Sequence, residues 1–71
     1  MKRVEAYLKF LWTIGEIEAK VKSLYSWNSM MINEDEVTTN AMIGRIQQNL
    51  EELRDYVAKR IEIYKLMGEE V

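Results

Sequence analysis

The sequence predicts an all-α fold, in which two long helices form an antiparallel helical hairpin that dimerises into a four-helix bundle. Two observations support this prediction. Apolar residues recur at alternating spacings of three and four, which places a continuous stripe along one side of a helix, as in a coiled coil. Proline, which breaks helices, is absent from all 71 residues. The pattern describes an architecture and names no activity.

The first helix is expected over residues 3 to 27. Ser and Asn side chains compete for backbone hydrogen bonds, so the polar segment 26–29 is expected to weaken the helix. A connection is therefore expected over residues 28 to 35. The apolar stripe of this helix skips only Asn28 and consists of Tyr7, Phe10, Ile14, Ile17, Val21, Leu24 and Met31.

The second helix is expected over residues 36 to 68. Asn33 and Glu36 have the spacing of a capping box, with Asn in place of Ser or Thr. Arg60 occupies the one position of the stripe that should be apolar. Its stem can lie over the core, or its charge can pair with Glu5 and help to set the register. The remaining stripe consists of Ile43, Ile46, Leu50, Leu53, Val57, Tyr64, Met67 and Val71.

The short connection favours an antiparallel hairpin, and residues 1 to 71 are expected to form a single domain. A turn near Ile32 would place Tyr7 opposite Val57. The second helix would then extend past the start of the first one. The apolar residues expected to lack a partner within the chain are Tyr64, Met67 and Val71.

A second apolar face is expected on the first half of the first helix. It consists of Leu8, Leu11, Trp12 and Gly15. Trp is common at the centre of protein interfaces, and Gly allows a second helix to approach closely. Together with the unpartnered end of the second helix, this face predicts an interface between chains. A homodimer is the favoured assembly, and the alternatives are a different protein partner or a membrane surface.

Composition argues against an enzyme. The sequence has no Cys and no His, so the commonest general base and the strongest nucleophile are missing. We expect no catalytic residue, no cofactor and no metal site, with Glu51, Glu52 and Asp55 on a solvated face. A domain this small buries only about 60% of its unfolded surface, and without disulfides or zinc it depends on oligomerisation for stability.

The expected function is that of a non-catalytic module for oligomerisation or protein–protein interaction, acting as a small scaffold or adaptor. One alternative is a structural subunit that builds filaments. Another is a dimeric regulator that binds nucleic acid through basic residues gathered at one end of the bundle. These residues are Lys2, Arg3, Lys9, Lys59, Arg60 and Lys65.

We expect a cytoplasmic protein. Its apolar stretch over residues 7 to 15 is shorter than the roughly 20 residues that span a bilayer, so no transmembrane segment is expected. The net charge is −2, so no overall field would draw the chain onto nucleic acid, and only a local basic patch could do so. The sequence does not identify a partner or a pathway.

Overall fold

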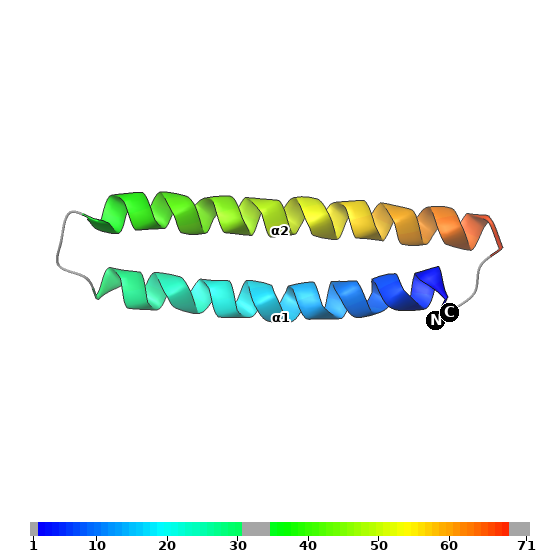
Figure 1. Ribbon diagram of the computed structural model, residues 1–71, viewed down its shortest axis with the longest axis horizontal. Helices are drawn as coiled ribbons and strands as arrows, with labels where there is room; N and C mark the ends of the chain where they lie inside the picture. The colour runs from blue at the N-terminus through cyan, green and yellow to red at the C-terminus, as the bar shows by residue number, and fades with distance from the viewer. Residues whose placement is uncertain (1, 31–34, 69–71) are drawn as a thin grey trace.

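The chain forms an antiparallel pair of helices in the computed structural model, which describes residues 2–30 and 35–68. Helix α1 spans Arg3–Ser29 and helix α2 spans Asp35–Leu66, and the two lie side by side over most of their length (Figure 1). The predicted all-α helical hairpin is therefore confirmed. In the described ranges, neither helix combines the length and the hydropathy needed to cross a membrane.

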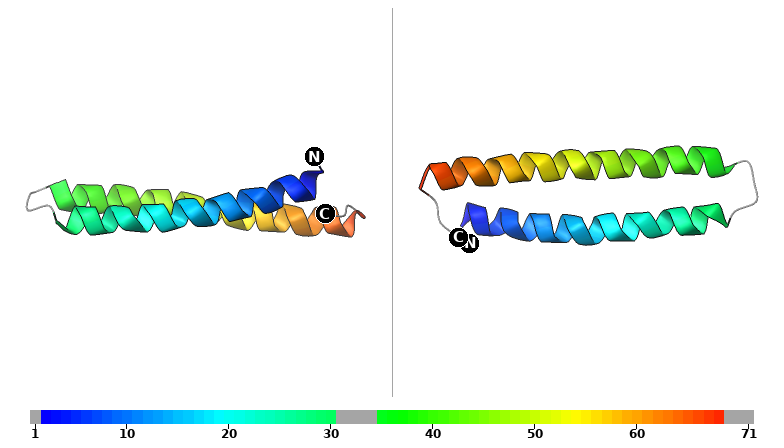
Figure 2. Two further views of the ribbon diagram at one scale, coloured as in Figure 1. Left: turned by 90° about the horizontal axis from the view of Figure 1, so that it is seen from below. Right: turned by 180° about the vertical axis from the view of Figure 1, so that it is seen from behind.

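The hairpin is long and thin. Its extents are 54 × 15 × 12 Å and its radius of gyration is 16.3 Å, whereas a compact domain of this length has a radius of about 11 Å. The helices cross at a shallow angle, so each remains beside the other from the turn to the chain ends (Figure 2). Only two layers of side chains are available to form a core.

Helix α1 continues two residues beyond the expected boundary. The polar side chains at its end form hydrogen bonds without ending the helix, since Ser29 Oγ donates to the Ser26 carbonyl at 2.8 Å and Asn28 Nδ2 donates to α2. Helix α2 ends at Leu66, followed by Gly68 with a φ of 90°. Glycine adopts this left-handed conformation without strain, as is usual after a helix. Asn33, the expected capping residue, lies outside the described residues.

The contact between the helices uses a different side of each helix from the one expected. The shared positions are correct, since Ile14, Val21, Ile43 and Val57 are all buried. Between these shared positions, the residues that face the other helix lie one position later in the sequence than predicted. On α1 they are Val4, Leu11, Glu18 and Tyr25, and on α2 they are Gln47, Arg54 and Ile61.

Five residues expected at this contact are instead at the surface, with 40 to 49% of their area exposed. They are Phe10, Ile17, Leu24, Ile46 and Leu53. Polar residues take the inner positions because they satisfy one another across the hairpin. Arg54 donates to Glu18 at 2.9 Å, and the Tyr25 hydroxyl donates to Gln47 Oε1 at 3.0 Å. Met31, the last residue of the stripe predicted for the first helix, lies outside the described residues.

The largest buried cluster lies near the chain ends. It consists of Val4, Val57, Ile61 and Tyr64, with Tyr7 and Leu11 packed against it. Tyr64 is thus buried within its own chain, and the expectation that it extends past α1 is wrong. Helical side chains lean toward their own N-terminus. In antiparallel helices these directions converge, so the Tyr7 ring stacks on Tyr64 at 6.0 Å rather than lying opposite Val57.

Candidate functional site

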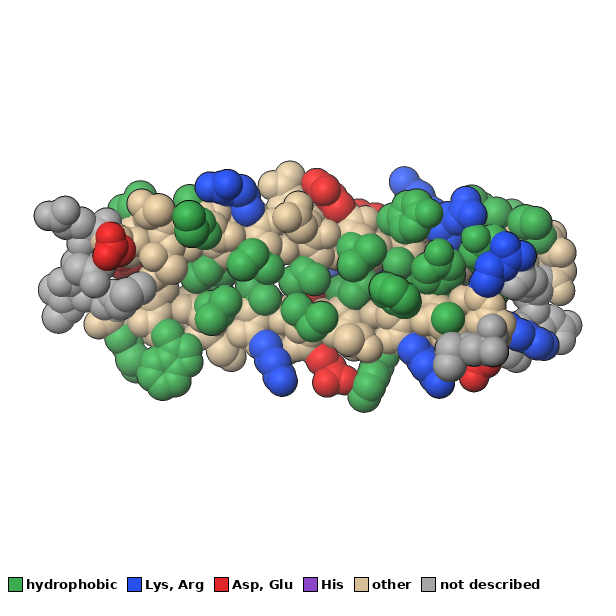
Figure 3. Space-filling model, viewed as in Figure 1, with side chains coloured by type: hydrophobic (Ala, Val, Ile, Leu, Met, Phe, Trp, Pro, Cys, Tyr) green, Lys and Arg blue, Asp and Glu red, His purple; other side chains and the backbone are tan. Residues whose placement is uncertain are grey.

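The most conspicuous surface is an apolar band along one side of the hairpin (Figure 3). It lies over the groove between the two helices and extends along most of their length. The nine large side chains that form it are 40 to 69% exposed. We call this surface the apolar face, and its residues are Phe10, Ile17, Leu24 and Trp27 of α1 with Met42, Ile46, Leu53, Tyr56 and Ile63 of α2.

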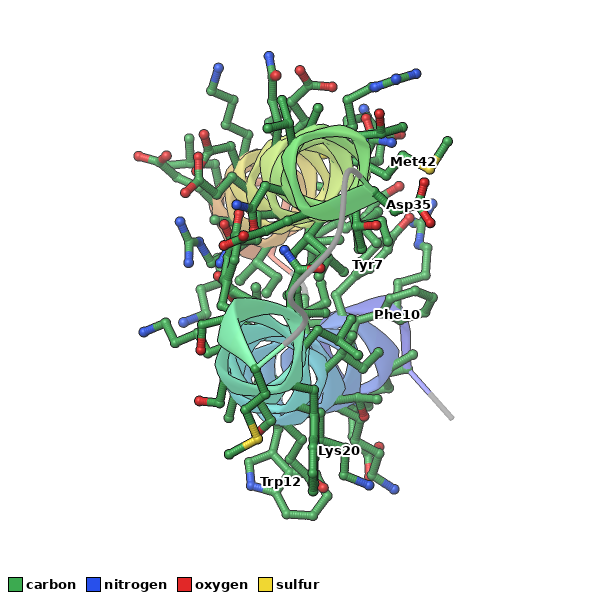
Figure 4. All side chains as sticks on the ribbon, turned by 90° about the vertical axis from the view of Figure 1, so that its left-hand side faces the viewer. Tyr7, Phe10, Trp12, Lys20, Asp35 and Met42 are labelled. Carbon is green, nitrogen blue, oxygen red and sulfur yellow. The ribbon has the colours of Figure 1, made fainter. Side chains whose placement is uncertain are left out.

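Heptad spacing places these nine residues together. Phe10, Ile17 and Leu24 are seven residues apart, as are Ile46 and Leu53, and each set immediately precedes the positions that face the other helix. In an antiparallel pair, equivalent flanking positions of the two helices meet on the same side. Figure 4 shows this arrangement at two points, since Phe10 of α1 and Met42 of α2 project to the same side of the helix pair.

The opposite side of the hairpin is less apolar. Of the predicted docking residues, Leu8 is exposed. A Cβ added at Gly15 would meet open space. Trp12 is 73% exposed and projects from α1 away from α2 (Figure 4). Leu11 instead turns inward against the buried cluster. The structure therefore separates Leu11 from the other three, and it places none of the four on the apolar face.

The end of α2 was also predicted to belong to an interface. Met67 is exposed, as is Leu66 beside it. Tyr64 is buried, and Val71 lies outside the described residues. Of the three predicted residues, Met67 is therefore the one that the described part of the chain shows to be exposed.

Two hollows mark the ends of the apolar face. One, of about 350 Å³, is near the turn and is lined by Leu24, Trp27, Asn28, Thr39 and Ile43. The other, of about 320 Å³, is near the chain ends and is lined by Ala6, Lys9, Phe10 and Thr13. Their linings are mainly apolar, which suits large apolar side chains better than a charged ligand.

Asn28 is the buried polar residue beneath the hollow near the turn. Only 2% of its surface is exposed. Its Nδ2 donates to Asn40 Oδ1 at 2.6 Å and to the Glu36 carbonyl at 3.2 Å, whereas its Oδ1 has no donor in the described hairpin. The sequence marked Asn28 only as a gap in the stripe, and the structure shows that it joins the two helices.

Two arginines surround Tyr64 at the other end of the hairpin. The guanidinium of Arg3 lies 4.3 Å from the ring centre and that of Arg60 lies 4.9 Å away. Arg60 also donates to the Tyr64 hydroxyl at 2.7 Å, and this hydrogen bond raises the pKa of Arg60 above its ordinary value. Its Nε is buried without an acceptor in the described residues. The residue that Arg60 binds is Tyr64, on its own helix, and not the Glu5 that the sequence offered.

Charge is distributed unevenly along the hairpin. The six basic residues singled out in the sequence lie in the half that carries the chain ends, where blue side chains gather in Figure 3. Two acids, Glu5 and Glu62, lie among them. Asp35 and Glu36 begin α2 at the turn, and the sequence has no Lys or Arg between residues 23 and 44. Within the described ranges, no three acidic side chains lie close enough together to hold a metal ion.

Comparison with known proteins adds no family to this description. No family model, no curated protein and no solved structure matches the chain.

Proposed function

We propose that this protein is a non-catalytic helical module that associates with itself through the apolar face. The observation that carries this proposal is the gathering of nine large apolar side chains on one side of a two-helix hairpin. Single exposed apolar residues are ordinary, but a contiguous band of this size marks an interaction surface. In this proposal the hairpin acts as a small scaffold or adaptor.

The exposed area supports the proposal quantitatively. The chain exposes 5614 Å², whereas a compact monomer of its mass exposes about 4700 Å². At roughly 150–200 Å² per large side chain, the nine residues leave on the order of 800 Å² uncovered. One partner in a standard protein–protein interface buries about this area, near 800 Å².

The expected stripe has a direct interpretation in such an assembly. A helix in a bundle carries apolar residues at three of seven positions, because it contacts more than one neighbour, whereas a two-stranded coiled coil needs only two. Ile17 and Leu53 occupy the additional apolar position of the heptad, the one that the contact within the hairpin does not use. They were predicted to contact the other helix of the hairpin, but they are exposed. In a four-helix bundle they would point between the two hairpins.

The test is the solution mass of the full chain. Light scattering at micromolar concentration should give at least twice the chain mass of 8.5 kDa. Circular dichroism on the same samples should show that helicity falls on dilution, because assembly and folding of such a small domain are linked. A folded monomer at this concentration would refute the proposal, and a mass that grows without limit would indicate a filament instead.

The basic end of the hairpin favours one alternative function, the binding of nucleic acid. Phosphate contacts by Lys and Arg dominate such binding and make it strongly dependent on salt. Mobility shifts at low salt with RNA and with DNA would detect it. Replacing Lys2, Lys9 and Lys59 by Gln should then flatten the salt dependence. The absence of any shift would exclude this alternative.

A further inference from the structure

We propose that a second copy of the chain sits on the apolar face in the antiparallel sense, so that the chain ends of one hairpin lie over the turn of the other. This inference rests on the proposed self-association and adds the orientation of the partner. A face-to-face dimer with two-fold symmetry has two arrangements, with the turns at the same end or at opposite ends. Charge, apolar spacing and surface shape each favour opposite ends.

Charge separates the two arrangements. Residues 2–9 and 59–66, the described segments nearest the chain ends, carry six basic side chains and two acidic ones, while Asp35 and Glu36 lie at the turn. Turns at the same end would bring two basic ends together, and like charges repel at this range. Turns at opposite ends would place each basic end over an acidic turn. The antiparallel dimer therefore has complementary charge at both ends.

The spacing of the apolar face is self-complementary about a single centre. In a two-fold interface, each contact between residue i and residue j occurs twice. A two-fold axis beside Ile17 would place Ile17 against its own copy and Phe10 against Leu24 of the second copy. The same axis passes between Ile46 and Leu53, which therefore face each other across the interface. The hairpin brings these two helix segments to about the same level, because α1 ends at Ser29, α2 begins at Asp35, and the helices run side by side from the turn (Figure 1).

The two hollows fit this arrangement. The hollow beside Phe10 would lie at the level of Leu24 and Trp27 of the second copy, and the hollow beside Leu24 would receive Phe10 in return. Large side chains would thus enter holes on the opposite hairpin, as in other helix bundles. The arginine-rich end of the second copy would also come to the level of Asn28, whose Oδ1 lacks a donor in its own hairpin.

Cysteine cross-linking can test the orientation cleanly, because the sequence has no Cys. Disulfides form only between residues whose Cα atoms lie within about 7 Å. Ile17→Cys should therefore yield a covalent dimer, and Ala19→Cys, exposed on the other side of α1, is its control. A mixture of Phe10→Cys and Leu24→Cys chains should give the mixed dimer, identified by intact mass. Matched pairs should react about tenfold faster or more than unmatched ones, since bound thiols have effective concentrations near millimolar.

The outcomes distinguish the orientation from the self-association itself. A rapid mixed disulfide between Phe10→Cys and Tyr56→Cys chains would show that the turns lie at the same end, which overturns this inference but leaves the proposed function. A dimeric mass without cross-linking on the apolar face would also overturn it, by placing the interface elsewhere. A monomeric mass for the unmodified chain would overturn both. Circular dichroism of each variant verifies that the helices are intact.

Discussion

The side-chain amide of Asn28 on α1 donates a hydrogen bond of 2.6 Å to Asn40 Oδ1 on α2, inside an otherwise apolar contact near the turn. A second bond reaches the Glu36 carbonyl at 3.2 Å. Asn28 is buried whereas Asn40 is exposed, so a slip in register would leave the Asn28 amide unpaired in the core while Asn40 could bond to water. The pair therefore ties the start of α2 to the end of α1.

Replacing Asn28 by Leu should stabilise the protein by about 1 kcal/mol, because the buried Oδ1 has no donor and its desolvation is then no longer required. The thermal midpoint should rise by about 4–8 °C for a domain of this size. Thermal unfolding at fixed protein concentration measures the change. Asn40→Ala is the comparison, and it should lower the midpoint by leaving the Asn28 amide with one acceptor fewer. A lower midpoint for Asn28→Leu would mean that the two hydrogen bonds outweigh the unpaired carbonyl.

Two valines offer a matched test of the core near the chain ends. Val57 is 1% exposed and belongs to the buried cluster, whereas Val37 on the same helix is 79% exposed. Val57→Ala should cost roughly 1–3 kcal/mol through lost burial and the cavity left behind. Val37→Ala should change stability by less than about 0.5 kcal/mol. Urea unfolding of the two variants makes the comparison, and equal effects would contradict the described packing.

Much of the fold could be predicted from the sequence, because periodicity and the absence of proline determine the helices themselves. Which side of each helix faces the other could not be predicted as well. Apolar residues lie on both sides of the buried position of the heptad. Ile17 and Leu53 are therefore equally suited to a contact within the hairpin or to a contact with a second hairpin. In the structure the inner positions include polar residues, among them Glu18 and Arg54, which pair across the hairpin.

The register was misjudged for a different reason. Counting residues from the turn predicts which backbone positions lie opposite each other, but not the direction in which long side chains lean. Tyr7 and Tyr64 meet because both lean toward each other. Among the exposed residues, the sequence singled out Trp12 but not Trp27, Tyr56 or Ile63. For Tyr56 and Ile63, the sequence pattern that could have identified them is their spacing of seven residues, which extends the apolar face on α2.

The pair formed by Glu18 and Arg54 should contribute little to stability. Both side chains reach solvent, with 23% and 45% of their surfaces exposed. Exposed ion pairs contribute about 0.2–1 kcal/mol. A double-mutant cycle with Glu18→Gln and Arg54→Gln should give a coupling in that range, and it should weaken with added salt. A coupling of several kcal/mol would show that the pair is shielded from water in the assembled protein.

Salt should weaken the dimer if basic ends lie over acidic turns. Raising the ionic strength from about 0.05 to 0.3 M shortens the Debye length and therefore screens that attraction. Replacing Lys59 and Lys65 by Gln should also weaken association in low salt and reduce its salt dependence. Sedimentation equilibrium of both proteins measures these effects. Tighter association of the variant would contradict the antiparallel arrangement, because it would reveal repulsion between the ends.

The central claim is that the hairpin associates through its apolar face, and the most direct test compares two substitutions on the same helix. Ile17 lies midway between Phe10 and Leu24 on that face, and Trp12 projects from α1 away from α2. We expect Ile17→Ser to raise the dissociation constant by about 30-fold or more, equivalent to roughly 2 kcal/mol for an interface anchor, and Trp12→Ser to leave it nearly unchanged. Sedimentation equilibrium across a dilution series measures both. A dimer weakened by Trp12→Ser and unaffected by Ile17→Ser would contradict the claim and place the interface on the opposite side of α1.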